Sequence, residues 1–358
     1  MRKSTRGLML LSSIVAGALV LAGCSASTPS STTTGSNKPV ATTDFPFQLN
    51  FTPGGFNAGF EYAAEHGLYK DAGLNVTITP GTGSGVTAQL VASGQASVAY
   101  ADGVTVSALI AKGAPMKTIM TIYQSNPNEV TTLTSSGIKS IKDLKGHTVG
   151  VPTGGSQTAM LPILLAKNGL KDSDIQQVGL PGTSLVQALL QKQVDAILGS
   201  SDAYGVQLDA QGAKTRNWTF ADNGVSTVST SVFANSTYLV DHPTEVKAFI
   251  KASLAGWAAV IADPKEGAAA VKAYFPSSNE SQSLAELTAI SGLFCAGGAQ
   301  YVGKAPAESW SRTQSLLSGV GLLPAGIDAS KYYTYNYLPK DSELQKCSNG
   351  KVVPLAKN

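Results

Sequence analysis

The chain has 358 residues, with 26 Lys and Arg against 23 Asp and Glu. Three of the basic residues precede residue 7, so the rest of the chain carries both signs in equal number, and only 14% of all residues are charged. A near-neutral chain lacks the basic surface that nucleic-acid binding requires, so we expect no nucleic-acid partner.

Residues 1–23 have the pattern of an export signal. Basic residues at positions 2, 3 and 6 precede an apolar run, which ends in Leu-Ala-Gly before Cys24. The run is too short for a membrane span. The Leu-Ala-Gly-Cys ending resembles a bacterial lipobox, which predicts a lipid on Cys24. We therefore expect an extracytoplasmic protein anchored to the membrane by that lipid, at the cell surface or in the periplasm.

Residues 24–44 are rich in Ser, Thr and Pro and show no apolar periodicity. Such a segment cannot bury a core, so we expect a flexible tether. Folded sequence begins near residue 45. The remaining stretch of about 315 residues exceeds one ordinary core, which favours two lobes.

Apolar strands and helices alternate from residue 47 to residue 123. The pattern predicts strands at 47–51, 74–79, 96–100 and 116–123, and helices at 56–69, 85–93 and 104–111. Alternating strands and helices indicate an α/β lobe with a parallel sheet that is covered on both faces.

A second alternating set follows. It predicts strands at 147–151, 175–180 and 194–198, and helices at 159–168, 184–191 and 204–211. Residues 89–99 and 187–197 each read as a helix, a tight turn and a buried strand. We therefore expect two α/β lobes of related build.

The chain after residue 226 reads as helical, at 243–261, 264–274, 281–293 and 306–318. These helices lack strands of their own, so we expect them to return to the first lobe. The predicted domains are then 45–124 with 226–358 for lobe 1, and 125–225 for lobe 2. The chain would cross between the lobes near 124–126 and near 223–225, and two crossover strands form a hinge over a cleft.

Two cysteines remain outside the signal, Cys295 and Cys347. Outside the cytoplasm an even pair predicts a disulfide, which would close the C-terminal tail onto the chain near residue 293. The alternative is a pair of buried free thiols.

Glycine-rich turns at 81–86 and 152–157 each lead from a strand into a helix. The first turn has neither the Lys of a Walker loop nor the spacing of a dinucleotide fingerprint. What remains is a helix start with free backbone N–H groups. Two such turns on opposed lobes are suited to grip one small polar ligand, and the alternative is that both are only tight connections.

The charges near these turns favour one ligand class. Turns 52–57, 81–86 and 152–157 contain no Lys, Arg or His, whereas Asp102, Asp202 and Asp222 each follow a predicted strand. Carboxylates without a guanidinium suit a ligand that offers N–H donors. The alternative is that Asp102 and Asp202 are helix N-caps. Four aromatic residues also fall near strand ends, where a flat ligand can stack: Phe56, Tyr100, Tyr123 and Tyr204. The alternative is that each of them is a core residue.

Several segments resemble a known family of solute-binding proteins, those for nitrate, sulfonates, taurine and thiamine-pyrimidine precursors. The resemblance lies in 52–76, 83–96, 143–151 and 194–196. It implies a two-lobed α/β periplasmic-binding-protein-like fold of type II, and an ABC permease and ATPase as partners. The pyrimidine-precursor branch tends to carry His where Asn57 stands, so the ligand stays open. Related pyrimidine synthases carry a cysteine-rich motif that this chain lacks.

The residues expected at the ligand site combine the turns, the strand ends and the family's binding loops. They are Thr52, Phe56, Asn57, Gly83, Ser84, Gly85, Asp102, Tyr123, Thr153, Gly154, Gly155, Ser156, Gln157, Ser200, Asp202, Tyr204 and Asp222. The three histidines are scattered and no metal-ligand spacing occurs, so we expect neither a metal nor a cofactor.

The sequence therefore predicts a monomeric, lipid-anchored solute-binding subunit of an ABC importer for a flat, nitrogen-heterocyclic, pyrimidine-like ligand. One alternative is a receptor for a sulfonate, taurine or nitrate. Another is a pyrimidine-related enzyme on the same fold, for which Lys70 and Lys112 are the nearest candidate catalytic groups. A third is a sensor that signals without transporting.

Overall fold

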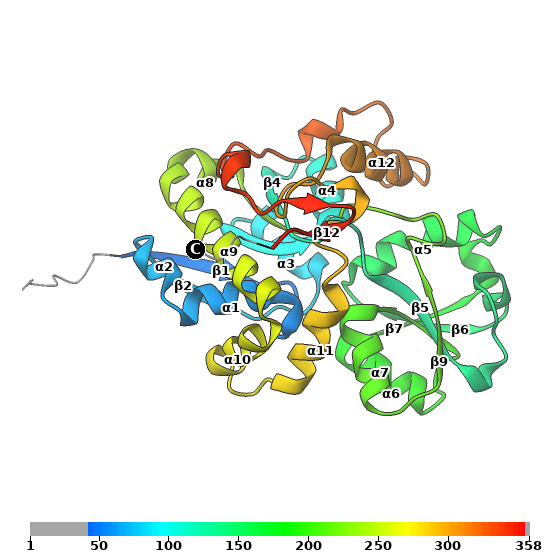
Figure 1. Ribbon diagram of the computed structural model, residues 1–358. Helices are drawn as coiled ribbons and strands as arrows, with labels where there is room; N and C mark the ends of the chain where they lie inside the picture. Colours follow the sequence, from blue (N-terminus) through cyan, green and yellow to red (C-terminus); the bar gives the residue numbers. More distant parts are fainter. Residues whose placement is uncertain (1–41, 355–358) are drawn as a thin grey trace, which may run out of the picture. The chain divides into compact units, whose positions relative to one another are not determined.

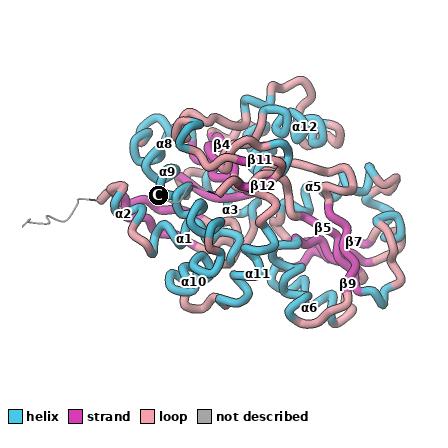
Figure 2. The backbone as a smooth tube through the Cα atoms, viewed as in Figure 1, coloured by secondary structure: helices cyan, strands magenta, loops and turns pink. Residues whose placement is uncertain are grey.

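Two five-stranded mixed sheets organise the chain in the computed structural model, which describes residues 42–354. The predicted signal, Cys24 and nearly all of the predicted tether lie outside the described residues. Figure 2 draws the strands in magenta, and β5, β7 and β9 lie together, away from β4. We call the first sheet with its covering helices the first lobe, and the second sheet with its helices the second lobe.

The first sheet has the strand order β2-β1-β3-β10-β4. β1 runs parallel to β2 and β3, whereas β10 is antiparallel to both β3 and β4. The strands are β1 (Thr43–Gln48), β2 (Leu74–Thr79), β3 (Val98–Asp102), β4 (Met116–Thr121) and β10 (Thr230–Asn235).

The second sheet has the order β7-β6-β8-β5-β9. β6 runs parallel to β7 and β8, and β5 is antiparallel to β8 and β9. The strands are β5 (Asn128–Leu133), β6 (Thr148–Pro152), β7 (Gln176–Leu180), β8 (Ala196–Ser200) and β9 (Thr215–Thr219).

The two sheets share one plan, in which an antiparallel fourth strand arrives from the other lobe. β10 holds that place in the first sheet and β5 holds it in the second. The two-lobed fold and the related build of the lobes are confirmed. The expectations of all-parallel sheets and of purely helical sequence after residue 226 are wrong, because β5, β9 and β10 are strands that the pattern missed.

The chain crosses between the lobes twice, from β4 to β5 and from β9 to β10. The two crossing segments lie side by side and are joined by hydrogen bonds. The side-chain amide of Asn126 donates to the carbonyl oxygen of Val225 (2.8 Å) and to the hydroxyl of Thr227 (3.0 Å). The backbone N–H of Ser229 donates to the carbonyl oxygen of Tyr123 (3.2 Å).

Short helices connect the strands of both lobes. In the first lobe they are α1 (Ala58–Glu65), α2 (Leu68–Asp71), α3 (Ser84–Ala92) and α4 (Gly103–Ala111); in the second they are α5 (Ser156–Lys167), α6 (Leu185–Leu190) and α7 (Val206–Ala210). The single helix expected at 56–69 is divided, because Gly67 at φ +74° ends α1 before α2 begins. A π-helical turn, η6 (Ser201–Gly205), precedes α7.

The C-terminal helices are α8 (Ser236–Asp241), α9 (Pro243–Ala262), α10 (Pro264–Tyr274), α11 (Glu280–Ile290) and α12 (Ala307–Ser318). α9 and α10 pack against α1, as Figure 1 also shows. The rings of Phe47, Phe60 and Phe249 meet in this core, with Phe47 4.7 Å from Phe60 and 4.8 Å from Phe249 between centroids. α12, by contrast, packs against α5 of the second lobe. The domain boundaries expected at residues 125 and 226 stay a prediction.

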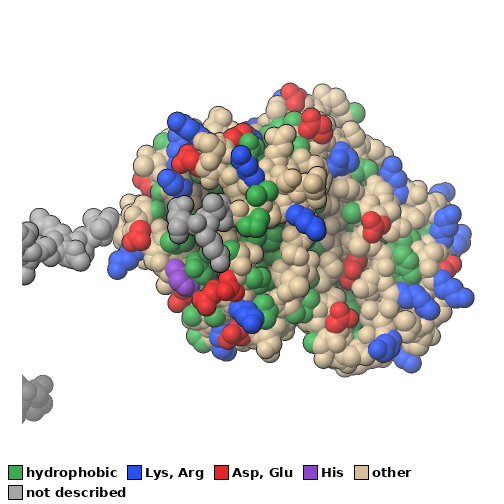
Figure 3. All heavy atoms as spheres, viewed as in Figure 1, with side chains coloured by type: hydrophobic (Ala, Val, Ile, Leu, Met, Phe, Trp, Pro, Cys, Tyr) green, Lys and Arg blue, Asp and Glu red, His purple; other side chains and the backbone are tan. Residues whose placement is uncertain are grey.

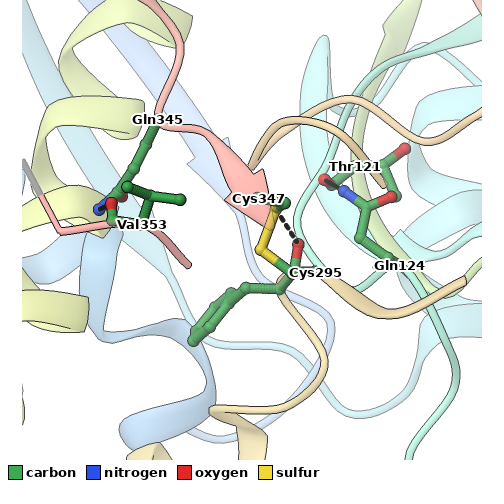
Figure 4. The surroundings of a disulfide bond; sticks show 7 residues. Thr121, Gln124, Cys295, Gln345, Cys347 and Val353 are labelled. Carbon is green, nitrogen blue, oxygen red and sulfur yellow. Dashed lines mark hydrogen bonds between the residues drawn. A yellow bond between two sulfur atoms is a disulfide. The ribbon is translucent and has the colours of Figure 1, made fainter. Parts of the chain in front are cut away.

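The C-terminal tail is fastened by a disulfide between Cys295 and Cys347, whose Cα atoms lie 5.5 Å apart (Figure 4). Cys347 opens the two-residue strand β11 (Cys347–Ser348), which pairs with β12 (Lys351–Val352). The tail also reaches the edge of the first sheet, where Gly303 bridges to Thr121 of β4 and Tyr333 bridges to Thr118. The bond therefore ties the last described residues to the first lobe.

Charged side chains of both signs lie scattered over the face drawn in Figure 3. Within residues 42–354, no helix is both long enough and apolar enough to cross a bilayer.

Candidate functional site

A cavity of about 80 Å³ lies where the two lobes face each other. The parallel strands β3, β6 and β8 end at it with Asp102, Pro152 and Ser200, and the antiparallel strands β5 and β10 begin there with Asn128 and Thr230. Ligands of open α/β sheets bind beyond the carboxyl ends of the parallel strands, which is the end exposed here. The cavity is therefore the candidate ligand site.

Three aromatic side chains form an apolar side of the cavity: Phe51, Phe56 and Tyr204. The Phe51 ring lies 6.3 Å from the Tyr204 ring, edge to face, and 6.4 Å from the Phe56 ring. Phe51 and Phe56 belong to the first lobe and Tyr204 to the second. Aromatic faces supplied by both lobes suit a flat ring that is held between them.

Two helix starts reach the cavity from opposite lobes. α3 begins after Gly83 and α5 begins after Gly155. Both N-cap residues are glycines, so neither helix start has a hydrogen bond from its backbone N–H groups to an N-cap side chain. Uncapped helix starts present backbone N–H donors and the positive end of the helix dipole. They can donate to a carbonyl oxygen, a ring nitrogen or an anion.

Asp102 ends β3 and has two roles that the sequence presented as alternatives. One carboxylate oxygen caps α4 by accepting from the backbone N–H of Val104 (2.9 Å), and the other accepts from the Ser229 hydroxyl (2.9 Å). The residue also lines the cavity. Burial raises the pKa of Asp102 to about 6, and the hydrogen bonds from Ser229 and Val104 limit that rise.

Asp202 lies in η6 and is only 5% exposed. Its Oδ1 atom has no hydrogen-bond partner among the described residues. Burial raises the pKa of Asp202 to about 6. The residues that line the cavity in the described part of the chain include no Lys, Arg or His. A buried carboxylate oxygen without a partner is costly, so this atom is ready to accept a hydrogen bond from a ligand.

The cavity gathers most of the residues expected at the ligand site. Eleven line it: Phe56, Gly83, Ser84, Asp102, Thr153, Gly155, Ser156, Gln157, Ser200, Asp202 and Tyr204. Residues from the turns 52–57, 81–86 and 152–157 and from the strand ends at Asp102 and Ser200 therefore meet in one place.

Six expected residues do not line the cavity. Thr52 is exposed, and buried Asn57 accepts from the backbone N–H of Gly54. Tyr123 donates from its hydroxyl to the carbonyl oxygen of Phe56 (2.8 Å). Asp222 is exposed and accepts from the Thr219 hydroxyl, because the strand it follows, β9, is at the far edge of its sheet.

The remaining two, Gly85 and Gly154, contact each other. The backbone N–H of Gly85 donates to the carbonyl oxygen of Gly154 (2.9 Å). The two glycine turns therefore touch directly at this point instead of enclosing a ligand between them.

Sequence reasoning missed ten lining residues: Asn50, Phe51, Thr82, Pro127, Asn128, Pro152, Gly182, Ala203, Ser229 and Thr230. Four of them belong to the crossing segments and to the first residues of β5 and β10, which the pattern did not identify as strands. Phe51 was assigned to the first strand, but β1 ends at Gln48, so Phe51 lies in the loop that faces the cavity. A shorter first strand would have placed it there.

Within the described residues, no group of three or more His, Cys, Asp and Glu side chains is placed to hold a metal ion.

The family described as NMT1/THI5 like matches residues 57–267. The chain belongs to this NMT1/THI5-like family. The match starts in the loop that carries Phe56 and extends through both sheets into α10. The resemblance inferred from the sequence motifs is thereby confirmed at the level of the family.

Two relatives of this NMT1/THI5-like chain are named for different functions. The riboflavin-binding protein RibY of Chloroflexus aurantiacus is 26% identical over 350 residues, which cover 90% of this chain and 96% of RibY. A 4-amino-5-hydroxymethyl-2-methylpyrimidine phosphate synthase of Uromyces fabae is 29% identical over 217 residues, 57% of this chain and 62% of the synthase. The relatives of this chain thus include both a binding protein and an enzyme.

Among solved structures, the periplasmic aliphatic sulphonate binding protein SsuA from Escherichia coli matches with a TM-score of 0.64 and 16% identity. The match covers 81% of this chain and 92% of SsuA. At this identity the likeness concerns the fold, and it places the NMT1/THI5-like chain among periplasmic-binding-protein folds.

Proposed function

We propose that the protein is the extracytoplasmic solute-binding subunit of an ABC importer, and that its cavity binds a flat nitrogen heterocycle of the pyrimidine or flavin type. The observation that carries the ligand class is Asp202, a buried carboxylate with an oxygen that lacks a partner, in a cavity lined by no cationic side chain. Such an atom selects a ligand that donates an N–H.

The other lining groups complement the same ligand class. Uncapped N–H groups at the starts of α3 and α5 donate to ring carbonyl oxygens or ring nitrogens. The rings of Phe51, Phe56 and Tyr204 supply stacking faces. The uracil-like edge of a flavin alternates carbonyl oxygens with an N–H, so it needs both the N–H donors and the carboxylate acceptor that line this cavity.

The relative RibY supports the flavin within this class, because the similarity spans almost the whole of both chains. The cavity volume of about 80 Å³ is well below the roughly 300–1,000 Å³ of typical ligand pockets. A flavin, with three fused rings, therefore requires the lobes to move apart before it enters. Motion about the two crossing segments, between β4 and β5 and between β9 and β10, supplies that opening.

The lipid on Cys24 and the permease and ATPase partners belong to the same proposal. Cys24 follows the lipobox-like Leu-Ala-Gly and lies outside the described residues. A lipid there would hold the receptor at the membrane that contains the importer.

One observation favours a second candidate, a small anion such as a sulfonate, taurine or nitrate. The uncapped starts of α3 and α5 are groups that bind anions, and the fold neighbour SsuA is named for sulphonate binding. Asp102 and Asp202 oppose this candidate, because two buried carboxyls repel an anion unless both are protonated.

An enzyme is the weaker proposal. The candidate lysines Lys70 and Lys112 are exposed at the ends of α2 and α4, and neither lines the cavity. A pyrimidine chemistry in this cavity would need a nucleophile or a base other than these two groups.

Isothermal titration calorimetry of the purified mature protein tests the ligand class. Riboflavin, an aminopyrimidine, taurine and nitrate are titrated in parallel at neutral pH. We expect saturable heat from riboflavin or the aminopyrimidine and none from the two anions. Saturable binding of taurine or nitrate with no response to either heterocycle would reject the proposal.

A further inference from the structure

The loop of residues 52–57, which carries Phe56 to the cavity, lies directly against α11. A Cβ at Gly55 would collide with the backbone carbonyl oxygen of Ser283, and a Cβ at Gly54 would collide with Oε2 of Glu286. Gly55 is therefore required for the loop to approach the helix this closely, and a side chain at Gly54 would displace the Glu286 carboxylate. The close packing against α11 explains why glycines stand at positions 54 and 55, since neither residue lines the cavity.

Glu286 is the polar group at this contact, and it is only 1% exposed. Its Oε2 accepts from the backbone N–H of Gly55 (2.6 Å), and its Oε1 accepts from the side-chain amide of Gln282 (2.8 Å). The Tyr123 hydroxyl donates to the carbonyl oxygen of Phe56 (2.8 Å). The backbone is thus fixed just before Phe56, at the N–H of Gly55, and at the carbonyl oxygen of Phe56 itself. Neither Glu286 nor Tyr123, which make these bonds, lines the cavity.

The same helix also touches the second lobe, because α11 packs against η6 and α7. Burial raises the pKa of Glu286 to about 7, and the charge of Asp202 in η6 adds to the rise. Buried Glu129 of β5, whose pKa burial raises to about 7, is also close to Asp202. Asp202 of the second lobe is thus coupled to Glu286 of α11 on one side and to Glu129 of β5 on the other.

The remaining charged groups on the packed elements are exposed. They are Glu280 on α11, Lys265, Glu266 and Lys272 on α10, and Asp209 on α7. Lys272 donates to the carbonyl oxygens of Pro276 and Ser278. No ion pair involves Glu286 within the described residues, so its hydrogen bonds to Gly55 and Gln282 are its stabilising contacts.

We propose that Glu286 is a positioning residue for the ligand site: it holds the Gly54–Asn57 loop on α11 and so fixes Phe56 in the cavity opposite η6. The expected effect of Glu286 on ligand binding rests on the proposed function. The expected effect of Glu286 on the order of the Gly54–Asn57 loop concerns the ligand-free protein and does not depend on the proposed function. Burying the Glu286 carboxyl, which is 1% exposed, costs free energy. Its hydrogen bonds to Gly55 and Gln282 offset part of that cost, and the bond to Gly55 fixes the loop.

Hydrogen–deuterium exchange and calorimetry on three variants of the mature protein test this role. Glu286→Ala removes the acceptor, Glu286→Gln keeps an acceptor without the charge, and Glu280→Ala is the control at an exposed position of the same helix. We expect Glu286→Ala to raise exchange of the residue 55–57 amides about tenfold in ligand-free protein and to weaken riboflavin binding about tenfold. Glu286→Gln restores most of both, and Glu280→Ala changes neither.

The pH profile separates positioning from plain packing. In the wild type the riboflavin affinity should fall as pH rises through about 7, because the ionised Glu286 carboxylate repels Asp202 across the closed cleft. In Glu286→Gln this fall should be reduced. Unchanged exchange at residues 55–57 in Glu286→Ala overturns the inference. If no heterocycle binds while exchange rises locally, the proposed ligand is wrong and the positioning of the loop stands.

Discussion

The backbone nitrogen of Gly85 lies 2.9 Å from the carbonyl oxygen of Gly154, to which it donates a hydrogen bond across the cleft. Gly85 is the second residue of α3 in the first lobe, and Gly154 precedes α5 in the second. A Cβ at position 85 would lie 2.9 Å from the same oxygen, closer than Cβ atoms approach in real structures. The lobes can therefore meet in this way only while position 85 lacks a side chain.

Gly85→Ala should weaken closure without weakening the fold. The added methyl group pushes Gly154 away, so we expect riboflavin affinity to fall about tenfold and the ligand-free protein to have a larger radius of gyration. Alanine is favoured over glycine inside a helix by about 1 kcal/mol, so the melting temperature should stay equal or rise. Calorimetry, small-angle X-ray scattering and thermal denaturation measure the three quantities.

Gly292→Ala is the matched control, because a Cβ at that position meets no atom within 4 Å. It should leave affinity and radius of gyration unchanged. A Gly85→Ala protein that binds and scatters like the wild type would show that the contact with Gly154 does not limit closure.

Asp202→Asn tests the acceptor that defines the ligand class. The amide is isosteric and removes the buried charge, so folding should be preserved or stabilised, while an N–H of the ligand loses its ionic partner. Hydrogen bonds to charged groups contribute about 1.5–3 kcal/mol, which corresponds to an affinity loss of roughly tenfold to a hundredfold. Calorimetry with the heterocycle that binds the wild type measures the loss. Asp222→Asn, at an exposed position outside the cavity, should bind normally, and equal affinities for all three proteins would remove Asp202 from the site.

The protein should become more stable as the pH falls from about 8 to about 5. Burial raises the pKa of Asp202 to about 6 and that of Glu129 to about 7, above the ordinary values of the unfolded chain. The folded protein therefore binds more protons than the unfolded chain in this window, and the stability these groups contribute is lost as the pH rises through 6 to 7. A shift of this size corresponds to on the order of 3 kcal/mol for one group. Buried Glu61, whose two carboxylate oxygens lack partners among the described residues, acts in the same direction.

Differential scanning calorimetry at about pH 5 and about pH 8 shows directly whether the melting temperature falls as the pH rises. Hydrogen bonds lower the pKa of Asp143, Asp174 and Asp328, so these groups act below this window and do not mask the trend. The double variant Asp202→Asn, Glu286→Gln should show a smaller difference between the two melting temperatures. A wild-type melting temperature that rises with pH would contradict the expectation.

The parts of the site that the sequence predicted are those with a local chemical signature. Gly83 and Gly155 stand before helix starts in glycine turns, and Asp102 is the last residue of a fully buried strand. Each could be recognised from its immediate neighbours. The plan of two lobes followed from the same alternation of strands and helices.

The parts that were missed depend on strands whose composition is polar. β5 has the sequence Asn-Glu-Val-Thr-Thr-Leu, and four of these side chains are polar, yet only its last residue is not fully buried. The Thr131 hydroxyl donates to Glu129 (2.9 Å), and that of Thr132 donates to the carbonyl oxygen of Asp195 (2.6 Å). The partner of Thr131 is two residues away on the same strand, and that of Thr132 is 63 residues away in the same lobe. A hydrophobic pattern reveals neither kind of partner. Because the pattern did not identify β5, the predicted site does not include Asn128, the first residue of that strand.

Removing the disulfide should lower the free energy of unfolding and leave the ligand site intact. Cys295 and Cys347 are 52 residues apart in sequence, and on the chain-entropy model closing such a loop contributes up to about 4 kcal/mol. Neither cysteine lines the cavity, so the Cys295→Ser, Cys347→Ser double variant should bind the wild-type ligand with an affinity within about threefold. Urea denaturation with and without a reductant provides the comparison. The reductant should shift the midpoint of the wild type and leave that of the double variant in place, whereas a wild type insensitive to reduction under unfolding conditions would show that the bond does not stabilise the fold.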